Sequence, residues 1–162
     1  MEKDGHVAFR PARAGDGEAV FEVTRASVAG LARHHYSGQQ IAGWMGDRTP
    51  AYYEGLIGLG NMVVAECEGD IVGFVDAEPG EVTRLFVLPG ASGTGLGRRL
   101  LEVGIARARS GHSGPIRLES TVNAEAFYRR HGFERVGTGI FSHGLGGDAI
   151  EIVHMELNPV AV

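Results

Sequence analysis

The sequence predicts a mixed α/β domain in which helices pack on both faces of one central sheet. Three observations lead to this prediction. At 162 residues, the chain has the size of one domain with one core. Segments that alternate apolar and polar residues, as strands do, take turns with segments whose apolar residues have helical spacing. No repeat, low-complexity tract or linker interrupts this order, so we assign residues 1–162 to a single domain.

The N-terminal part is expected to hold one strand and three helices. Residues 7–10 alternate apolar and polar, as a first strand does. An apolar stripe at helical spacing predicts a helix over 17–29. Ser37 is suited to cap a second helix. Pro50 suits the first position of a third, which ends near Ile57.

Three strands follow in the middle of the chain. Residues 61–67 and 70–77 read as strands joined by Glu68-Gly-Asp, which is a signal for a tight hairpin. A turn at Glu78-Pro-Gly then leads into a strand over 81–88. Together these strands form the expected centre of the sheet.

The C-terminal part continues with helices and strands in alternation. Thr121 or Asn123 can cap its second helix, and Gly132 suits the position just after that helix. The expected elements are a helix over 96–109, a strand over 116–120, a helix over 123–131, and a hairpin of 135–142 with 149–157.

Composition and charge exclude several classes of protein. A net charge of −5 argues against a nucleic-acid partner, since such proteins are usually basic. It would suit a cationic amine, although surface acidity commonly serves solubility alone. The single cysteine, Cys67, allows no internal disulfide and is expected in the core, which fits a reducing compartment. No apolar run reaches the length of a membrane span, and the start has no signal-peptide pattern, so we expect a cytoplasmic protein with no membrane partner.

The most informative stretch runs from Val82 to Leu101. An apolar strand leads into a turn with glycines at 93, 95 and 97, and an amphipathic helix follows directly. Backbone N–H groups at a helix start lack partners within the helix and carry partial positive charge, so they bind phosphate oxygens. The spacing is not the Gly-x-Gly-x-x-Gly of dinucleotide sites, and no Gly-Lys-Ser/Thr follows as in a P-loop. A plain tight turn is the alternative, and a nucleotide-phosphate site is a weaker one.

A second motif favours a phosphate-binding turn over a plain tight turn. It is Leu118–Phe133, which contains the pairs Asn123-Ala124, Phe127-Tyr128 and Gly132-Phe133. With Val87-Leu-Pro89 and the loop Ser92–Gly97, in this order and separation, it resembles the GNAT superfamily of N-acetyltransferases. The resemblance covers about residues 7–157. It implies a three-layer α/β/α fold around a splayed mixed sheet, and an enzyme that moves an acetyl group from acetyl-CoA to a primary amine.

The resemblance also implies how acetyl-CoA is held. In this family the strand before the glycine turn parts from its neighbour, and the pantetheine arm pairs with it as an added strand would. The Val87 amide would then donate to the oxyanion. Two positions depart from the family pattern: Ser92 stands where Gln or Arg is usual, and Thr121 where some relatives have Asn. The expected cofactor-binding residues are Leu85, Phe86, Val87, Ser92, Gly93, Thr94, Gly95, Leu96, Gly97, Arg98, Thr121 and Asn123.

Acetyl transfer to an amine also needs proton transfer, because amines have a pKa near 10. Tyr128 matches the family's tyrosine, which implies that it protonates the departing thiolate; a core aromatic is the alternative. Glu81 has the spacing at which some relatives place a catalytic glutamate, and a charged residue at a strand edge is its alternative. Further candidates for the base are Glu119, His143 and His154.

The acceptor is expected to be a small-molecule or peptide amine. Tyr36 and Trp44 lie in an aromatic cluster that could form a wall for it, while packing of two helices on the sheet is the alternative. His143 lies in the final hairpin, which often borders the acceptor site in this family. No metal site is expected. A CoA-binding sensor without turnover is the alternative function, and an exposed final hairpin would allow a homodimer.

Overall fold

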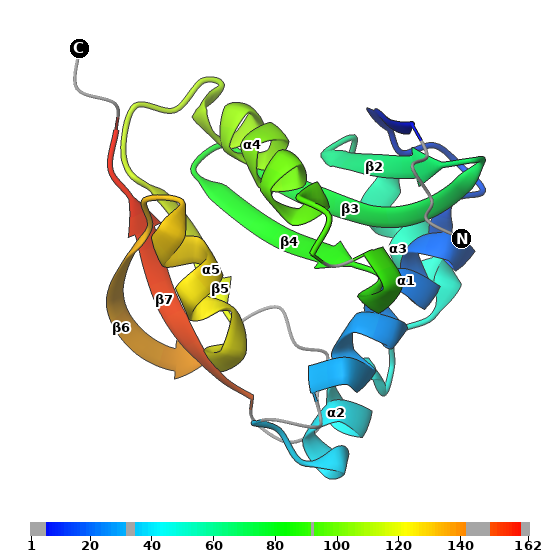
Figure 1. Ribbon diagram of the computed structural model, residues 1–162, viewed down its shortest axis with the longest axis horizontal. Coiled ribbons are helices and arrows are strands. Elements are labelled where there is room, and N and C mark those ends of the chain that lie inside the picture. The colour runs from blue at the N-terminus through cyan, green and yellow to red at the C-terminus, as the bar shows by residue number, and fades with distance from the viewer. Residues whose placement is uncertain (1–5, 32–34, 92, 142–149, 160–162) are drawn as a thin grey trace.

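The computed structural model describes residues 6–31, 35–91, 93–141 and 150–159 (Figure 1). The chain begins with one strand and three helices, and then continues with strands that alternate with two further helices. The elements are β1 (Val7–Pro11), α1 (Gly17–Leu31), α2 (Gly38–Met45), α3 (Pro50–Ile57), β2 (Met62–Cys67), β3 (Asp70–Glu78), β4 (Glu81–Val87), the 3₁₀ turn η1 (Pro89–Ala91), α4 (Leu96–Arg109), β5 (Ile116–Ser120), the 3₁₀ turn η2 (Val122–Ala124), α5 (Glu125–Arg130), β6 (Glu134–Ile140) and β7 (Glu151–Leu157).

One seven-stranded sheet runs through the molecule in the order β1-β2-β3-β4-β5-β7-β6. Its neighbouring strands are antiparallel except for β4 and β5, which are parallel. Within the described residues, these two strands pair only where Glu81 faces Arg117. Beyond that point they diverge, which is visible in Figure 1 as the opening between β4 and the β5–β7 side. The sheet is therefore mixed and splayed, and the predicted fold class is confirmed.

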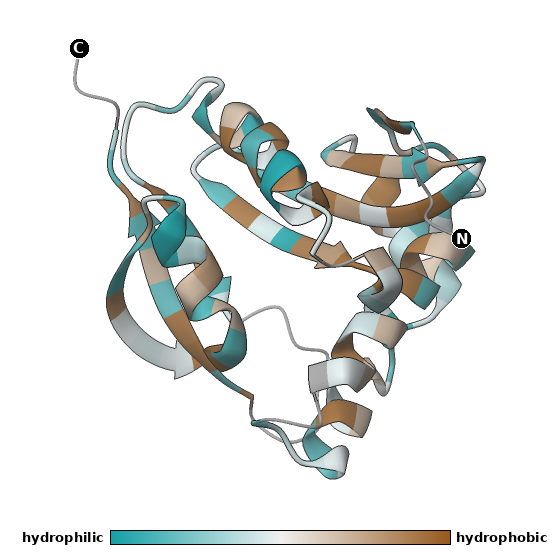
Figure 2. Ribbon diagram, viewed as in Figure 1, coloured by the Kyte–Doolittle hydropathy of each residue, from teal (hydrophilic) through white to brown (hydrophobic). Residues whose placement is uncertain are grey.

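Helices cover both faces of the sheet because its central strands are apolar on both sides (Figure 2). Val64 and Phe74 pack in one buried cluster with residues of α1 and α3. Their neighbours Val63 and Val75 face the opposite layer and pack under α4, in the cluster that also contains Cys67. A third cluster joins α1 and α2 to the strand β7; its buried members are Val28, Tyr36, Trp44, Ile150 and Ile152.

Local sequence signals set several element ends as predicted. Ser37 and Gln40 form a capping box, in which each side chain accepts a hydrogen bond from the other residue's amide, at 3.0 and 2.9 Å. The third helix starts at Pro50 and is capped by the Thr49 side chain. In the β2–β3 hairpin, Glu68 and Gly69 have φ values of 53° and 86°, the pair of positive values that a tight hairpin turn of this kind needs.

The helix predicted at 123–131 starts later than expected. The 3₁₀ turn η2 comes first, closed by the Ala124 amide on the Thr121 carbonyl oxygen, and Ala124 occupies the N-cap of α5. Neither Thr121 nor Asn123 therefore caps this helix, and that prediction was wrong. The end of the helix is as predicted, with Gly132 at a φ of 94°.

The C-terminal hairpin consists of β6 and β7, and the segment 142–149 lies outside the described residues. The edge strand β6 exposes Val136 and Ile140. Each is 56 % exposed, and the expected homodimer stays a prediction. None of the helices in the described ranges is long and apolar enough to cross a membrane.

Candidate active site

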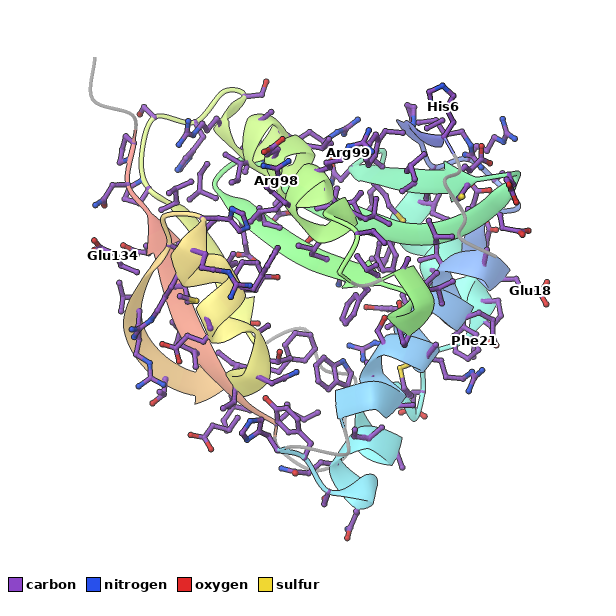
Figure 3. All side chains as sticks on the ribbon, viewed as in Figure 1. His6, Glu18, Phe21, Arg98, Arg99 and Glu134 are labelled. Atoms are coloured by element: carbon purple, nitrogen blue, oxygen red, sulfur yellow. The ribbon has the colours of Figure 1, made fainter. Side chains whose placement is uncertain are left out.

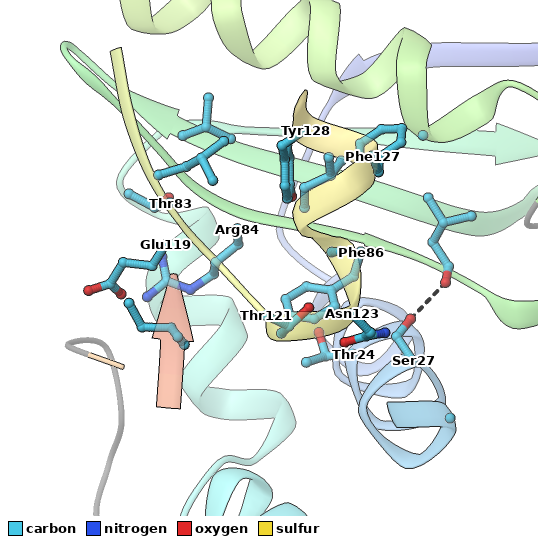
Figure 4. Close-up of a pocket in the computed structure, with 18 of the residues that line it drawn as sticks. Thr24, Ser27, Thr83, Arg84, Phe86, Glu119, Thr121, Asn123, Phe127 and Tyr128 are labelled. Atoms are coloured by element: carbon cyan, nitrogen blue, oxygen red, sulfur yellow. Dashed lines mark hydrogen bonds between the residues drawn. The ribbon is translucent and has the colours of Figure 1, made fainter. Parts of the chain in front are cut away.

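A cavity of about 730 Å³ lies where β4 and β5 separate (Figure 4). Its wall draws on both layers of helices: α1 and the end of α2 on one side, and the glycine turn with α5 on the other. The wall is positively charged, although the whole chain carries a net charge of −5. Its described acidic and arginine residues are Arg48, Arg84, Arg98, Arg130 and Glu119.

The strand β4 presents an open backbone edge to this cavity. The Leu88 amide donates to the Val72 carbonyl oxygen of β3 at 2.9 Å, so the backbone N–H of Leu88 points toward β3. Because backbone directions alternate along a strand, the N–H and C=O of Val87 point the other way, toward the gap. The Val87 carbonyl accepts a hydrogen bond of 2.7 Å from the Ser27 hydroxyl of α1 (Figure 4). The Val87 amide thus faces the cavity from an edge that β5 has left.

The glycine turn stands at the mouth of the cavity. Gly93 and Gly95 have φ values of 80° and 81°, in the left-handed region that favours glycine. Gly95 is the N-cap of α4 and makes no side-chain cap, so the first amides of that helix, which have no intrahelical partner, are not satisfied by an N-cap side chain either. Gly93, Gly95 and Gly97 all line the cavity. The geometry is compatible with phosphate oxygens, and phosphate binding by these positions stays a prediction.

The two arginines that follow the turn point in different directions (Figure 3). Arg98 lines the cavity and is 61 % exposed, with Glu102 at 4.0 Å from its Nε. The Arg99 guanidinium lies over the Phe9 ring, 4.7 Å from its centroid. The Thr94 hydroxyl turns back to the Ala91 carbonyl oxygen at 2.6 Å. Of these side chains, Arg98 is the one positioned to contact a ligand in the cavity.

Tyr128 lies between the two layers. It is 8 % exposed, lines the cavity, and its ring packs edge-on against Phe127 and Phe133. Among the described residues, no hydrogen-bond partner holds its hydroxyl. Burial raises the pKa of Tyr128 well above the usual value for tyrosine. The hydroxyl therefore stays protonated at neutral pH and is available to a ligand.

The two aromatic residues predicted for the acceptor site lie in different places. Trp44 is buried and lines the cavity. The Tyr36 hydroxyl instead donates to the Glu151 carbonyl oxygen at 2.8 Å and accepts from the Val122 amide at 3.1 Å. Tyr36 thus links η2 to β7 and is not among the described cavity-lining residues. Its observed contacts are structural.

A β-bulge in β4 places the Arg84 guanidinium on the cavity wall. Ala77 faces Val82 and Asp76 faces Arg84, so Thr83 is the extra residue. The Thr83 hydroxyl bonds Asp76, and the Arg84 Nη1 donates to Asp76 Oδ2 at 2.8 Å. Both side chains of this ion pair are nearly buried. Arg84 is therefore fixed in place on the α1 side of the cavity.

A second guanidinium comes from the link between α2 and α3. Arg48 is 5 % exposed, and its Nη1 donates to the Trp44 carbonyl oxygen. Its Cζ lies 5.8 Å from the centroid of the Tyr52 ring and 5.6 Å from that of Phe141. Such contacts between a cation and aromatic rings are favourable. Together they orient the guanidinium on the cavity wall.

The two carboxylates considered as bases, Glu119 and Glu81, also lie in different places. Glu119 lines the cavity, and Figure 4 shows it extending to the same end of the pocket as Arg84. Glu81 lies where β4 and β5 still pair and is not among the described lining residues. His154 faces Glu119 across the β5–β7 ladder. Ser92 and His143 lie outside the described residues, and the described part of the chain has no cluster of metal-ligating side chains.

Several cavity residues were missed by the sequence analysis: Thr24, Ser27, Arg48, Arg84, Arg130 and Phe141. Arg84 had a detectable signal, since a charged residue interrupts an apolar strand. Arg48 had none, because a charged residue between two helices usually lies in solvent.

The splayed sheet and the cavity built on it place the chain in the class of α/β N-acetyltransferases. Residues 32–158, most of the chain, match the family described as Acetyltransferase (GNAT) domain. The chain therefore belongs to the GNAT acetyltransferase family, and the resemblance is confirmed. No curated protein matches the sequence at a significant level.

Solved structures of other proteins share the fold. A GCN5-related N-acetyltransferase from Rhodopseudomonas palustris gives a TM-score of 0.85 at 21 % identity, over 93 % of this chain and 94 % of its own. PaiA N-acetyltransferase from Thermoplasma acidophilum, solved with coenzyme A, gives 0.73 at 20 %, over 94 % and 99 %. YncA from Salmonella typhimurium, solved with acetyl-CoA, gives 0.66 at 24 %, over 94 % of both chains.

Proposed function

We propose that this protein transfers an acetyl group from acetyl-CoA to a primary amine by direct attack, without an acyl-enzyme. The observation that carries the proposal is the open edge of β4, which lines one cavity together with the glycine turn and Tyr128. Cys67 supports direct attack, because it lies in the core and is absent from the described cavity lining. A thiol in that position cannot reach a ligand in the cavity.

The binding of acetyl-CoA is proposed to use backbone and charge together. The amides at the start of α4 would contact the diphosphate, because two left-handed glycines keep side chains away from them. Arg98 and Arg130 line the same cavity and add positive charge. The pantetheine arm would pair with the free edge of β4 at Leu85 and Val87.

The chemistry follows from the groups beside that edge. The amine nitrogen forms a bond to the thioester carbonyl carbon, and the Val87 amide donates to the oxygen as charge develops there. The carbon–sulfur bond then breaks, and the thiolate takes a proton from the Tyr128 hydroxyl. The amine proton goes to a carboxylate, which we assign to Glu119 because it lines the cavity. Glu81 is the alternative, acting through water.

The first test is Tyr128→Phe. Loss of the proton donor should lower kcat by about tenfold to a few hundredfold, while the Kd for CoA, measured by calorimetry, stays the same. Tyr36→Phe is the control, since it removes a hydroxyl outside the described cavity lining. An unchanged rate of thioester cleavage in Tyr128→Phe would contradict the role of Tyr128 as the proton donor. A protein that binds acetyl-CoA but cleaves none with any amine would instead be a CoA sensor.

The second test separates the two candidate bases. Glu119→Gln should lower the rate at neutral pH and lose less at alkaline pH, where more of the amine is already neutral. Glu81→Gln should leave the pH profile unchanged. The reverse result would assign the base to Glu81.

A further inference from the structure

Three hydroxyl groups on the α1 side of the cavity already donate to protein atoms (Figure 4). The Thr24 hydroxyl donates to a carbonyl oxygen of its own helix at 2.9 Å, and the Ser27 hydroxyl donates to that of Val87 at 2.7 Å. The Thr83 hydroxyl donates to Asp76 at 2.8 Å. An acceptor bound on this side would therefore not receive a hydrogen bond from any of the three unless a protein hydrogen bond broke first.

Two arginines line this side of the cavity but present little surface to it. Arg48 is 5 % exposed, and its guanidinium lies against the rings of Tyr52 and Phe141. The side chain of Arg84 is 11 % exposed, and the Asp76 carboxylate lies 2.8 Å from its Nη1. Such burial leaves a guanidinium little area for contact with a ligand. A charged group on the acceptor would therefore not gain a well-exposed partner here.

Aromatic rings face the same part of the cavity. Phe86 and Phe141 line it and are only partly buried. Their ring centroids lie 6.5 and 5.2 Å from that of Trp44, which also lines the cavity. Because side chains alternate along a strand, Phe86 points to the α1 side of β4, while its neighbours Leu85 and Val87 pack in the α4 layer. The three rings thus form one apolar surface beside the open edge of β4.

We infer that the acceptor is a primary amine whose other end is apolar and uncharged, and that Trp44, Phe86 and Phe141 bind that end. The inference rests on the proposed function, because it assumes that the amine is acetylated in this cavity. Burial of an apolar chain against these rings is favourable. A second ammonium group would lose its hydration without a carboxylate of its own, because Glu119 is the one acidic side chain among the described lining residues and is assigned to the reacting amine.

The experiment compares amines that differ only at the far end, with release of free CoA as the readout. The probes are propylamine, butylamine, pentylamine and hexylamine, with 1,5-diaminopentane and 5-aminopentanoate as charged counterparts of hexylamine. We expect kcat/KM to rise about fourfold for each methylene that becomes buried. Hexylamine should exceed both charged probes by about ten- to a hundredfold, the effect of burying a polar group without a partner. The diamine has two reactive amines, so their number cannot produce this preference.

Variants then assign the preference to the rings. Phe141→Ala should lower the ratio of kcat/KM for hexylamine to that for propylamine by about fivefold, and Phe141→Leu, which stays apolar, should lower it less. Phe21→Ala is the matched control, because the Phe21 ring packs on Tyr53 and is not among the described lining residues. Melting curves check that each variant folds. If Phe141→Ala does not fold, Phe141→Leu and the wild-type series decide.

The outcomes separate this inference from the proposed function. If either charged probe reacts as well as hexylamine, or if chain length has no effect, the inference is wrong, while acetylation of any of these amines leaves the proposed function intact. If acetyl-CoA binds and no amine reacts, the inference and the proposed transfer both fail. A preference for hexylamine that is unchanged in Phe141→Ala would overturn the role of Phe141.

Discussion

The two halves of the cavity differ in whether backbone groups or side chains form most of their surface. The half on the α4 side, which we propose for acetyl-CoA, is mainly backbone: two left-handed glycines, the first amides of α4 and the open edge of β4. The half on the α1 side, which we propose for the acceptor, is mainly side chains, with Trp44, Arg48 and Arg84 as its main members. The first half should thus be sensitive to changes in backbone conformation, and the second to changes in charge and side-chain packing.

The largest effect is expected where the acceptor half depends on a buried ion pair. Asp76→Ala leaves the Arg84 guanidinium nearly buried without its carboxylate. Removing one partner of a buried pair costs about 3–5 kcal/mol of the free energy of unfolding. Urea unfolding measures this loss. Glu22→Ala, at an exposed pair on α1, is the control and should change little. A loss for Asp76→Ala below about 1 kcal/mol, the level of a surface pair, would show that water in the cavity solvates Arg84.

A smaller effect is expected in the acetyl-CoA half. Gly95→Ala forces a Cβ onto a residue with a φ of 81°, which costs about 1–2 kcal/mol. Apart from its chain neighbours, no atom of the described residues lies within 4 Å of that Cβ, so backbone strain and closeness to the ligand account for the result. Gly90→Ala, which also meets open space and has no positive φ, is the control. We expect lower stability and weaker CoA binding for Gly95→Ala alone. Equal behaviour of both variants would contradict a backbone-built site.

The same difference explains what the sequence could predict. A glycine at a left-handed position has a direct physical cause, so the turn at Gly93 and Gly95 and the start of α4 are visible in the motif. The apolar runs that bury β2 and β3 on both faces are also visible in the sequence. These features are local, and each depends on a few neighbouring residues. The mixed α/β fold class followed from them, while the positions that we propose for acetyl-CoA came from the resemblance to the GNAT superfamily.

The acceptor half depends on contacts between distant residues. Arg48 lines the cavity, and Phe141, far along the chain, packs on its guanidinium. The direction of Arg84 depends on a β-bulge at Thr83 that alternation alone does not predict. Tyr36 had the right residue type for an acceptor wall, yet its hydroxyl bridges η2 and β7. Such outcomes depend on three-dimensional packing, which one sequence does not fix.

Tyr128 lies where the two halves meet, and its ionisation tests whether water is excluded from its hydroxyl. Burial raises its pKa, so the unfolded chain releases this proton near pH 10 while the folded chain keeps it. The stability that this difference contributes is present below pH 10 and is lost as the pH rises above it. In Tyr128→Phe, stability above pH 10 should fall less steeply, by up to about 1.4 kcal/mol per pH unit. Parallel curves, from urea unfolding at each pH, would mean that water reaches the hydroxyl.

The smallest effect is expected for the side chains that border the backbone-built half. Arg98 lines the cavity but is 61 % exposed, so its contact with a phosphate is screened by solvent. Arg98→Gln should raise the Kd for CoA by about fivefold or less, and added salt should reduce the difference. Arg99→Gln is the matched control, because Arg99 lies over Phe9. An equal or larger loss in Arg99→Gln would show that the first turn of α4 binds by its general charge. A loss of a hundredfold in Arg98→Gln would show that a side chain, and not the backbone, dominates this half.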